Sequence, residues 1–266
     1  DYNANAYPGA PNPAEPSCNS ASSWTTELVP GSEDDTAMYT SISIDWAGDV
    51  HVTWYSLANK RLMYSTDRSG LWVTEIIDAE GDAGWYSSSA VDDLGYVHIS
   101  YHDKGGGLLK YATDASGGWE IELLDGPAPN VGTFTSLAID QTGRVHIAYH
   151  DGQNGLLRYA RLEADGWQIQ DVAAQGLLRP HISLAVTAKG APSILFRDDA
   201  QDAINRVYGV NGFWKLDQLN AGEAMGYFPS HAVAANGDYR AAFYQCLQFV
   251  GFACWTTALN MALGSP

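Results

Sequence analysis

Two Tyr-His-Asp motifs, 48 residues apart, carry the side chains best suited to chemistry. A histidine titrates near neutral pH, so it can take up or release a proton when tyrosine and arginine side chains lie beside it. An arginine and an aspartate occupy the corresponding place one repeat further on, and an arginine can stabilise a developing anion. The candidate residues are His102, Asp103, His150, Asp151, Arg197 and Asp198.

Three kinds of site are compatible with these residues. Proton abstraction by a histidine beside Arg197 is the chemistry of a polysaccharide lyase. Two of the aspartates could instead act as the acid and the nucleophile of a glycoside hydrolase. The histidines and aspartates could also ligate a metal, but their spacing does not define a shared centre, so we expect neither a metal nor a cofactor.

These motifs belong to a repeat of 47 or 48 residues, which is marked by a serine, by a glycine seven residues later and by a tryptophan. The serines are Ser41, Ser88, Ser136, Ser183 and Ser230, and the tryptophans are Trp72, Trp119, Trp167 and Trp214. In residues 135–172 the repeat holds four apolar-alternating runs separated by turn residues, which predicts a four-stranded antiparallel meander. Four strands in a period of this size are typical of one blade of a β-propeller.

The count of markers predicts how the ring closes. Only four tryptophans follow the five serines, and a fifth, Trp24, lies ahead of the first repeat in a segment that matches residues 72–77. We infer that the N-terminal strand completes the last blade. The sequence therefore predicts an all-β fold: a single five-bladed β-propeller of four-stranded antiparallel blades over residues 23–266, closed by the N-terminal strand, after a flexible leader at residues 1–22.

Composition and cysteines indicate an extracytoplasmic protein. A net charge of −17 makes nucleic acid and anionic membrane surfaces poor partners, and no apolar run is long enough to span a membrane. Residues 1–17 lack a signal-peptide pattern, so we expect a secreted or periplasmic protein whose signal peptide has been removed. Repeat alignment puts Cys254 at the end of a strand at residues 250–256, near Cys18. We expect a Cys18–Cys254 disulfide, with Cys246–Cys254 as the alternative.

Several short motifs resemble the repeats of secreted bacterial propellers of the Asp-box, or BNR-like, type. The motifs are Val-His-Ile-x-Tyr-x-Asp, Leu-x-Tyr-Ala and Gly-x-Trp. Residues 65–72 look like an Asp-box lengthened by one residue, and residues 113–119 look like a more degraded copy. The resemblance covers the chain from Ser23 onward and implies the propeller fold, with the Asp-box at the turn between third and fourth strands. The family includes sialidases, but no arginine triad is found here, since only Arg197 occupies a rim position.

The positions around the predicted axis differ from blade to blade, whereas the structural positions repeat. The residues expected at this rim are Tyr39, Tyr55, Tyr86, His102, Phe134, His150, His181, Arg197, Phe228 and Tyr244. Such variation would build one asymmetric site on a symmetric frame, and the alternative is that the loops have simply drifted. The repeated Asp45 and His51 are expected instead to form a turn and an inter-blade hydrogen bond.

The leading hypothesis is a secreted, monomeric binding module that recognises a glycan or another small extracellular ligand in the central depression at this rim. Tyr39, Tyr55 and Tyr86 would offer apolar faces, and the histidines, aspartates and Arg197 would fix the ligand's orientation. The second hypothesis is a glycan-cleaving enzyme, lyase or hydrolase, that uses the six residues named first. The third is a protein-interaction scaffold without a small-molecule site.

Overall fold

The computed structural model describes residues 26–264 apart from 34, 175–180, 199–200, 202, 222–226, 235 and 251–252. In this part of the chain all regular structure is β, with nineteen strands in five antiparallel sheets. It follows that the described residues include no helix that could span a membrane.

Every sheet follows chain order, so hairpins join neighbouring strands. The first two sheets are β1 (Ala37–Ile44), β2 (Val50–Ser56), β3 (Arg61–Thr66), β4 (Val73–Asp78), then β5 (Ala83–Val91), β6 (Val97–Asp103), β7 (Leu108–Thr113) and β8 (Glu120–Asp125). The next two are β9 (Val131–Ile139), β10 (Val145–Asp151), β11 (Leu156–Glu163), β12 (Gly166–Ala174), then β13 (Ile182–Val186), β14 (Pro192–Asp198), β15 (Ala203–Val210) and β16 (Phe213–Ala221). The last has three described strands, β17 (Tyr227–Val233), β18 (Tyr239–Val250) and β19 (Ala253–Gly264).

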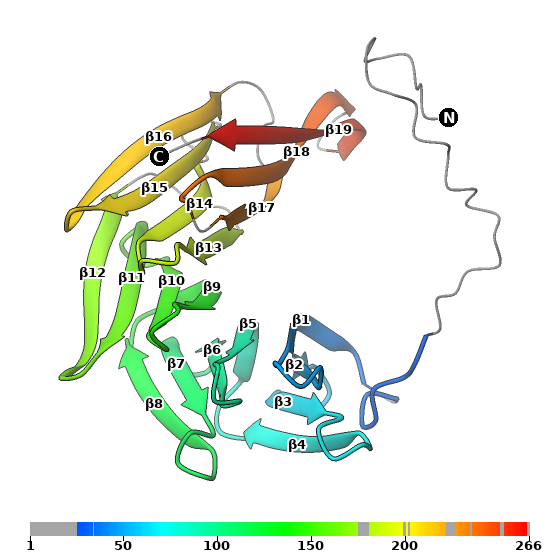
Figure 1. Ribbon diagram of the computed structural model, residues 1–266. Coiled ribbons are helices and arrows are strands. Elements are labelled where there is room, and N and C mark those ends of the chain that lie inside the picture. The colour runs from blue at the N-terminus through cyan, green and yellow to red at the C-terminus, as the bar shows by residue number, and fades with distance from the viewer. Residues whose placement is uncertain are drawn as a thin grey trace, which may run out of the picture.

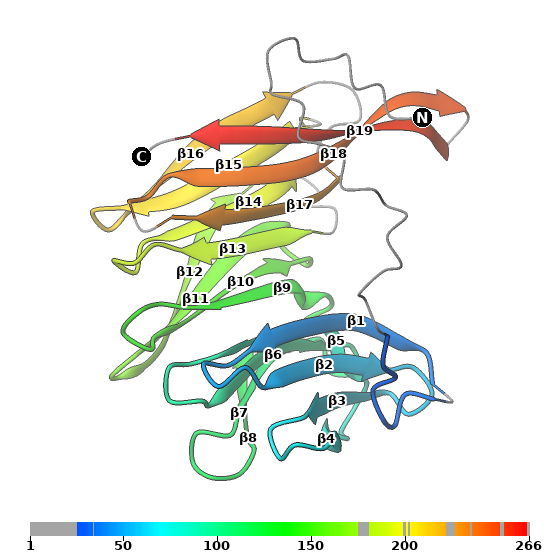
Figure 2. The same cartoon turned by 45° about the vertical axis from the view of Figure 1, so that its right-hand side comes forward.

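The five sheets fan out around a common centre. The first strands β1, β5, β9, β13 and β17 lie innermost, and the fourth strands lie at the outside (Figure 1). In a view turned by 45° the sheets lie one against the next in chain order (Figure 2). This arrangement fits a β-propeller, and it brings the starts of the inner strands together around one axis.

The repeated serine joins each sheet to the next. Its hydroxyl oxygen accepts a hydrogen bond from a backbone N–H 48 or 49 residues further on, in the inner strand of the following sheet. The pairs, with N···O distances, are Ser41 with Ser89 (3.0 Å), Ser88 with Leu137 (3.0 Å), Ser136 with Leu184 (3.0 Å) and Ser183 with His231 (3.2 Å). An inner strand has no neighbour on its axial side, so the serine satisfies an N–H that the sheet itself leaves unpaired.

Asp–His–Tyr sets, in which the histidine and the tyrosine are buried, occupy the same place in the first three sheets. The members are Asp45, His51 and Tyr64, then Asp92, His98 and Tyr111, then Asp140, His146 and Tyr159. Each histidine Nδ1 lies 2.5–2.7 Å from the tyrosine hydroxyl, and each Nε2 lies 3.3–3.6 Å from the aspartate. The prediction of inter-blade bonds at these histidines is therefore wrong, because these sets link strands of one sheet.

The repeated tryptophans pack between sheets. The indoles of Trp119, Trp167 and Trp214 meet a tyrosine of the preceding sheet edge-on, with ring centroids 5.0–5.1 Å apart. Edge-to-face aromatic pairs are favourable beyond their buried area. These residues therefore form the core between sheets, as the repeat predicts.

The last sheet departs from the predicted repeat. The second strands β2, β6, β10 and β14 begin and end where the repeat places them. In the last sheet, however, β18 continues to Val250 and β19 runs from Ala253 to Gly264, so the bounds predicted for the third strand, residues 250–256, are wrong. Cys254 pairs with Phe249 near the start of β19 rather than ending a strand. Cys18 lies outside the described residues, and the disulfide stays a prediction.

The first sheet exposes a position that is buried in later sheets. Ile42 in β1 is 67% exposed, whereas Leu137 and Leu184, at the same repeat position, are 7% exposed. Trp24 itself lies outside the described residues. The prediction that the N-terminal strand completes the last blade is wrong for the described part of that segment, because residues 26–29 form no strand. Just after them, the Pro30 carbonyl accepts a 2.6 Å hydrogen bond from Thr74 of β4, so the chain here lies against the first sheet.

Candidate functional site

Four consecutive sheets place a ring-bearing side chain at the start of the inner strand, in an unusual backbone conformation. The φ angle is 54° at Tyr39, 56° at Tyr86, 55° at Phe134 and 133° at His181. Non-glycine residues rarely adopt positive φ, and holding one there costs about 1–3 kcal/mol. The pairing of β1 with β2 and of β5 with β6 is interrupted at the same points, as in a bulge that re-aims a side chain.

These side chains line one cavity of about 400 Å³, called here the axial cavity. Its lining residues are Tyr39, Thr40, Tyr86, Ser87, Phe134, Thr135, His181 and Ile182. Ring centroids lie 4.5 Å apart between Tyr39 and Tyr86, and 4.1 Å apart between Tyr86 and Phe134. The three rings form one continuous apolar surface at the centre of the molecule.

Hydroxyl groups hold this aromatic surface in place. The Ser87 hydroxyl donates a 2.7 Å hydrogen bond to the Tyr39 carbonyl, and the Thr135 hydroxyl lies 3.3 Å from the Tyr86 carbonyl. Each strained carbonyl is thus bonded from the following sheet. Burial, followed by the neighbouring Tyr39, raises the pKa of Tyr86, so its phenol stays a neutral hydrogen-bonding group.

The aromatic surface continues outward over the first two sheets. The Trp85 ring lies 5.2 Å from Tyr39 and 5.0 Å from Tyr55. The Asp82 carboxylate accepts hydrogen bonds from the Tyr55 hydroxyl (2.5 Å) and the Trp85 indole (2.9 Å), and Lys104 Nζ stands 3.9 Å over the Trp85 ring. Burial, followed by the bond to Asp82, raises the pKa of Tyr55 to about 12.

Sequence reasoning missed Trp85, Asp82 and Lys104. A signal was present, because the residue before each ring position can be compared between repeats. Those residues are Met38, Trp85, Thr133, Pro180 and Tyr227. Only the second and fifth repeats carry an aromatic side chain at this position. The position therefore differs between repeats, as the predicted rim positions do, and could have been noticed for the same reason.

His102 and His150 lie behind the aromatic surface. Their rings are 6.4 Å from Tyr86 and 6.3 Å from Phe134, and their exposed fractions are 2% and 9%. His102 Nδ1 donates to the Val131 carbonyl at 2.8 Å, and His150 Nδ1 bonds the hydroxyl of a threonine in β9 at 3.1 Å. Burial lowers the pKa of both imidazoles, so they are neutral at pH 7.

The candidate acidic residues bind the turns that follow the second strands. Asp103 and Asp151 pair with a basic residue of the next strand at 3.0 and 3.2 Å and accept backbone N–H groups of their own turns. Asp198 accepts the Gln201 N–H at 3.2 Å, and Arg197 is only 6% exposed. None of the four lines the axial cavity as the described residues define it.

The remaining predicted rim residues are placed only in part. Tyr55 contacts the outer end of the aromatic surface through Trp85, and burial lowers the pKa of His181 in the axial cavity. Phe228 and Tyr244 lie in β17 and β18, and their side chains are outside the described part. Within the described part, no three His, Cys, Asp or Glu side chains gather as a metal site.

Comparisons with known proteins identify the fold. No family model matches the sequence, and no curated protein matches it significantly. A Dyadobacter fermentans protein of unknown function superposes with a TM-score of 0.61 at 12% identity, over 88% of this chain and 80% of that one. The fold and the site together define a class: a propeller-type all-β protein with an aromatic-lined axial cavity.

Two further similar structures act on or bind glycans. The Aleuria aurantia lectin has a TM-score of 0.55 at 13% identity, covering 84% of this chain and 77% of that one. A Hadza microbial sialidase has a TM-score of 0.54 at 11% identity, covering 77% and 53%. At these identities the likeness concerns the fold.

Proposed function

We propose that the protein is a secreted, monomeric five-bladed propeller that binds a glycan, or another small extracellular ligand, in the axial cavity. The observation that carries the proposal is the run of positive-φ residues Tyr39, Tyr86, Phe134 and His181 around one cavity. Backbone strain at repeated positions needs a compensating gain, and aromatic rings that stay partly exposed around a cavity are a poor structural gain by themselves.

The cavity suits the chemistry of a sugar. A saccharide ring presents C–H faces that pack on aromatic rings, and its hydroxyls need donors and acceptors at the edge. The aromatic surface from Phe134 to Trp85 supplies the apolar face. Asp82 and Lys104, which contact Trp85 beyond the lining of the axial cavity, supply the polar groups. The lectin and the sialidase among the similar structures support a carbohydrate ligand.

Glycan-array binding with purified protein tests the proposal. We expect wild type to retain a restricted set of glycans, Tyr86→Ala to abolish retention of the uncharged ones and Tyr86→Phe to keep most of it, because the ring face makes the contact. Tyr96→Ala, a partly exposed tyrosine outside the axial cavity, is the matched control. Absence of any retained glycan, or equal retention by Tyr86→Ala, overturns the proposal.

Glycan cleavage is the second hypothesis, and the same samples test it. The neutral, buried state of His102 and His150 favours binding over proton transfer. Incubation with the retained glycans followed by analysis for new reducing or unsaturated ends separates the two. Products that disappear in His102→Ala and His150→Ala would establish the enzyme, and retention without products supports the binding module.

A further inference from the structure

Two cavities outside the axial site occupy equivalent places between sheets. One, of about 590 Å³, lies between the first and second sheets, and the other, of about 440 Å³, lies between the third and fourth. Both cavities are formed mainly by two kinds of turn: those between the first and second strands of a sheet and those between the third and fourth strands. These turns lie at the opposite end of the inner strands from Tyr86. Most lining positions of the second correspond to those of the first by a shift of 95 residues.

The two cavities share one frame. In the first, the Trp119 indole N–H donates to the Glu75 carboxylate at 3.0 Å. In the second, the Trp214 indole N–H donates to the Gln170 carbonyl oxygen at 2.9 Å. A shift of 95 residues also relates the Trp119–Glu75 pair to the Trp214–Gln170 pair. The two cavities therefore share a backbone frame, and they differ in the other side chains that line them.

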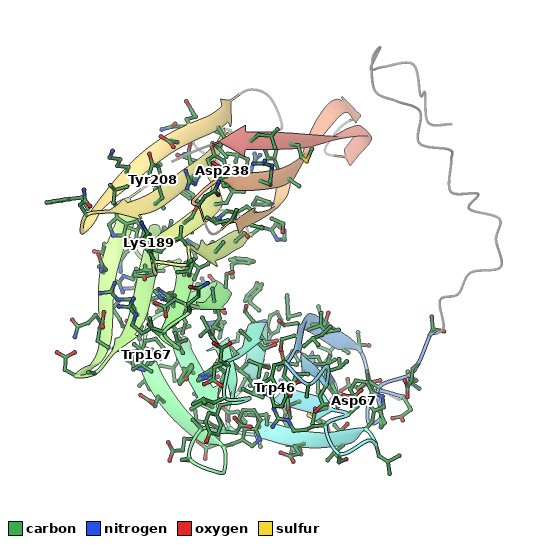
Figure 3. The ribbon with its side chains drawn as sticks, viewed as in Figure 1. Trp46, Asp67, Trp167, Lys189, Tyr208 and Asp238 are labelled. Atoms are coloured by element: carbon green, nitrogen blue, oxygen red, sulfur yellow. The ribbon has the colours of Figure 1, made fainter. Side chains whose placement is uncertain are left out.

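The two cavities differ in the charge of the residues that line them. The first, or acidic, cavity holds one basic residue and four carboxylates: Arg68 with Asp45, Asp49, Glu75 and Asp114. The second, or basic, cavity holds Arg144, Arg161 and Lys189, and no carboxylate lines it among the described residues. The chain has 14 basic and 31 acidic residues, so three cations at one cavity run against its composition. Figure 3 labels Trp46 of the acidic cavity and Lys189 of the basic one.

The cations of the basic cavity are only partly neutralised. Arg144 pairs with Asp140 at 2.8 Å, and Arg161 pairs with Glu163. The Arg161 Nε is nevertheless buried and donates no hydrogen bond within the described part of the chain. Lys189 is exposed, and among the described residues no carboxylate pairs with it. A buried donor without an acceptor is unfavourable, and an oxyanion would satisfy it.

An apolar surface stands beside these charges. Phe213, at the rim of the basic cavity, is 76% exposed, and the acidic cavity has a glycine, Gly118, at the same position. A ligand that fits both features carries an anionic group for the cations and a ring face for the phenyl group.

We infer that the basic cavity is a second binding site, which takes a saccharide unit bearing a sulfate or carboxylate group. The anion is held by Arg144, Arg161 and Lys189, and the sugar ring packs on Phe213. The saccharide part rests on the proposed function, whereas the anion part stands on the charges and the unsatisfied donor of the cavity itself.

Calorimetry at low ionic strength tests the inference, with glucose 6-sulfate, glucuronate, glucose and sodium sulfate as probes. Low salt is needed because ions screen a partly exposed site. We expect one or both anionic sugars to bind and glucose not to bind here. Lys189→Leu, which installs the residue of the acidic cavity (Leu94), should weaken binding by about tenfold. Arg161→Gln should act in the same direction.

Controls separate this site from the axial one. Lys215→Gln removes an exposed charge outside the cavity and should leave binding unchanged, and so should Tyr86→Ala. Binding of an anionic sugar that survives Tyr86→Ala, while array retention of uncharged glycans is lost, places the anion in a different cavity. Equal affinity for glucose, or full affinity in Lys189→Leu, overturns the inference. Binding of sodium sulfate but of neither anionic sugar overturns the saccharide assignment.

Discussion

A single serine hydroxyl connects each inner strand to the next, and its removal should lower the free energy of unfolding. In Ser136→Ala the Leu184 N–H loses its acceptor and gains none, because Leu184 is only 7% exposed. Leaving a buried donor unpaired costs about 1–3 kcal/mol. We expect urea denaturation to show a loss of that size with an unchanged m-value. Ser116→Ala, in an exposed turn, should change stability by less than about 0.5 kcal/mol, and similar losses in both variants would contradict this role.

Residue type alone did not reveal what the histidines do. The repeat correctly places His102 and His150 at the ends of second strands, because alternation and turn residues fix those strands. It does not tell on which side of the inner strand an imidazole lies. That depends on the bulges at Tyr86 and Phe134, which turn the aromatic rings toward the axis and leave the imidazoles behind them.

At the scale of the strand, two glycines let the inner strands approach the preceding sheet. Gly132 has φ 87°, and a Cβ there would lie 2.7 Å from the Cα and Cβ of Leu109; Gly84 stands in the same relation to Leu62. Gly132→Ala combines a clash with a disfavoured conformation, so we expect a loss of about 2 kcal/mol or more in the free energy of unfolding. Because Phe134 follows two residues later, glycan retention should fall as well.

The matched control is Gly118→Ala. A Cβ at Gly118 meets nothing within 4 Å, so the change should be neutral or slightly stabilising. Thermal denaturation of both variants gives the comparison. If Gly132→Ala is as stable as Gly118→Ala, the inner strand does not need the close approach.

Strand boundaries show where sequence reasoning works and where it stops. In the first four repeats, turn residues interrupt the apolar alternation, and the second strands were predicted residue for residue. In the last repeat, residues 246–249 read Cys-Leu-Gln-Phe and contain no turn former. β18 therefore continues through them, and the register of β19 differs from that of the other third strands.

The whole molecule should lose stability in mild acid. Burial is the first cause that lowers the pKa of every histidine in the chain, and the pKa of His231 falls to about 4. The seven are His51, His98, His102, His146, His150, His181 and His231. With folded pKa values below 6.5, the unfolded chain binds protons first as the pH falls. Stability is thus complete above about pH 6.5 and is lost below it.

Denaturation at pH 7.5 and pH 5.5 measures this effect. Each pKa unit of lowering contributes about 1.4 kcal/mol once the unfolded histidine is protonated, so the summed loss should exceed that of a single group. His181→Gln, at the axial cavity, should reduce the difference between the two pH values. Equal or greater stability at pH 5.5 would contradict the neutral, buried state of the histidines.

Closure of the ring is the largest-scale consequence of the serine pattern. Each repeated serine accepts the N–H of the residue after the next sheet's serine, so in a closed ring Ser230 would accept the N–H of Ile42. Both residues are exposed in the present arrangement. We propose that the last sheet packs on the first, which would bury Ile42 as Leu137 and Leu184 are buried. Amide hydrogen exchange should then show a protected Ile42 N–H that becomes fast in Ser230→Ala, with a stability loss like that of Ser136→Ala. A fast-exchanging Ile42 N–H and a neutral Ser230→Ala would mean that the sheets form an open arc.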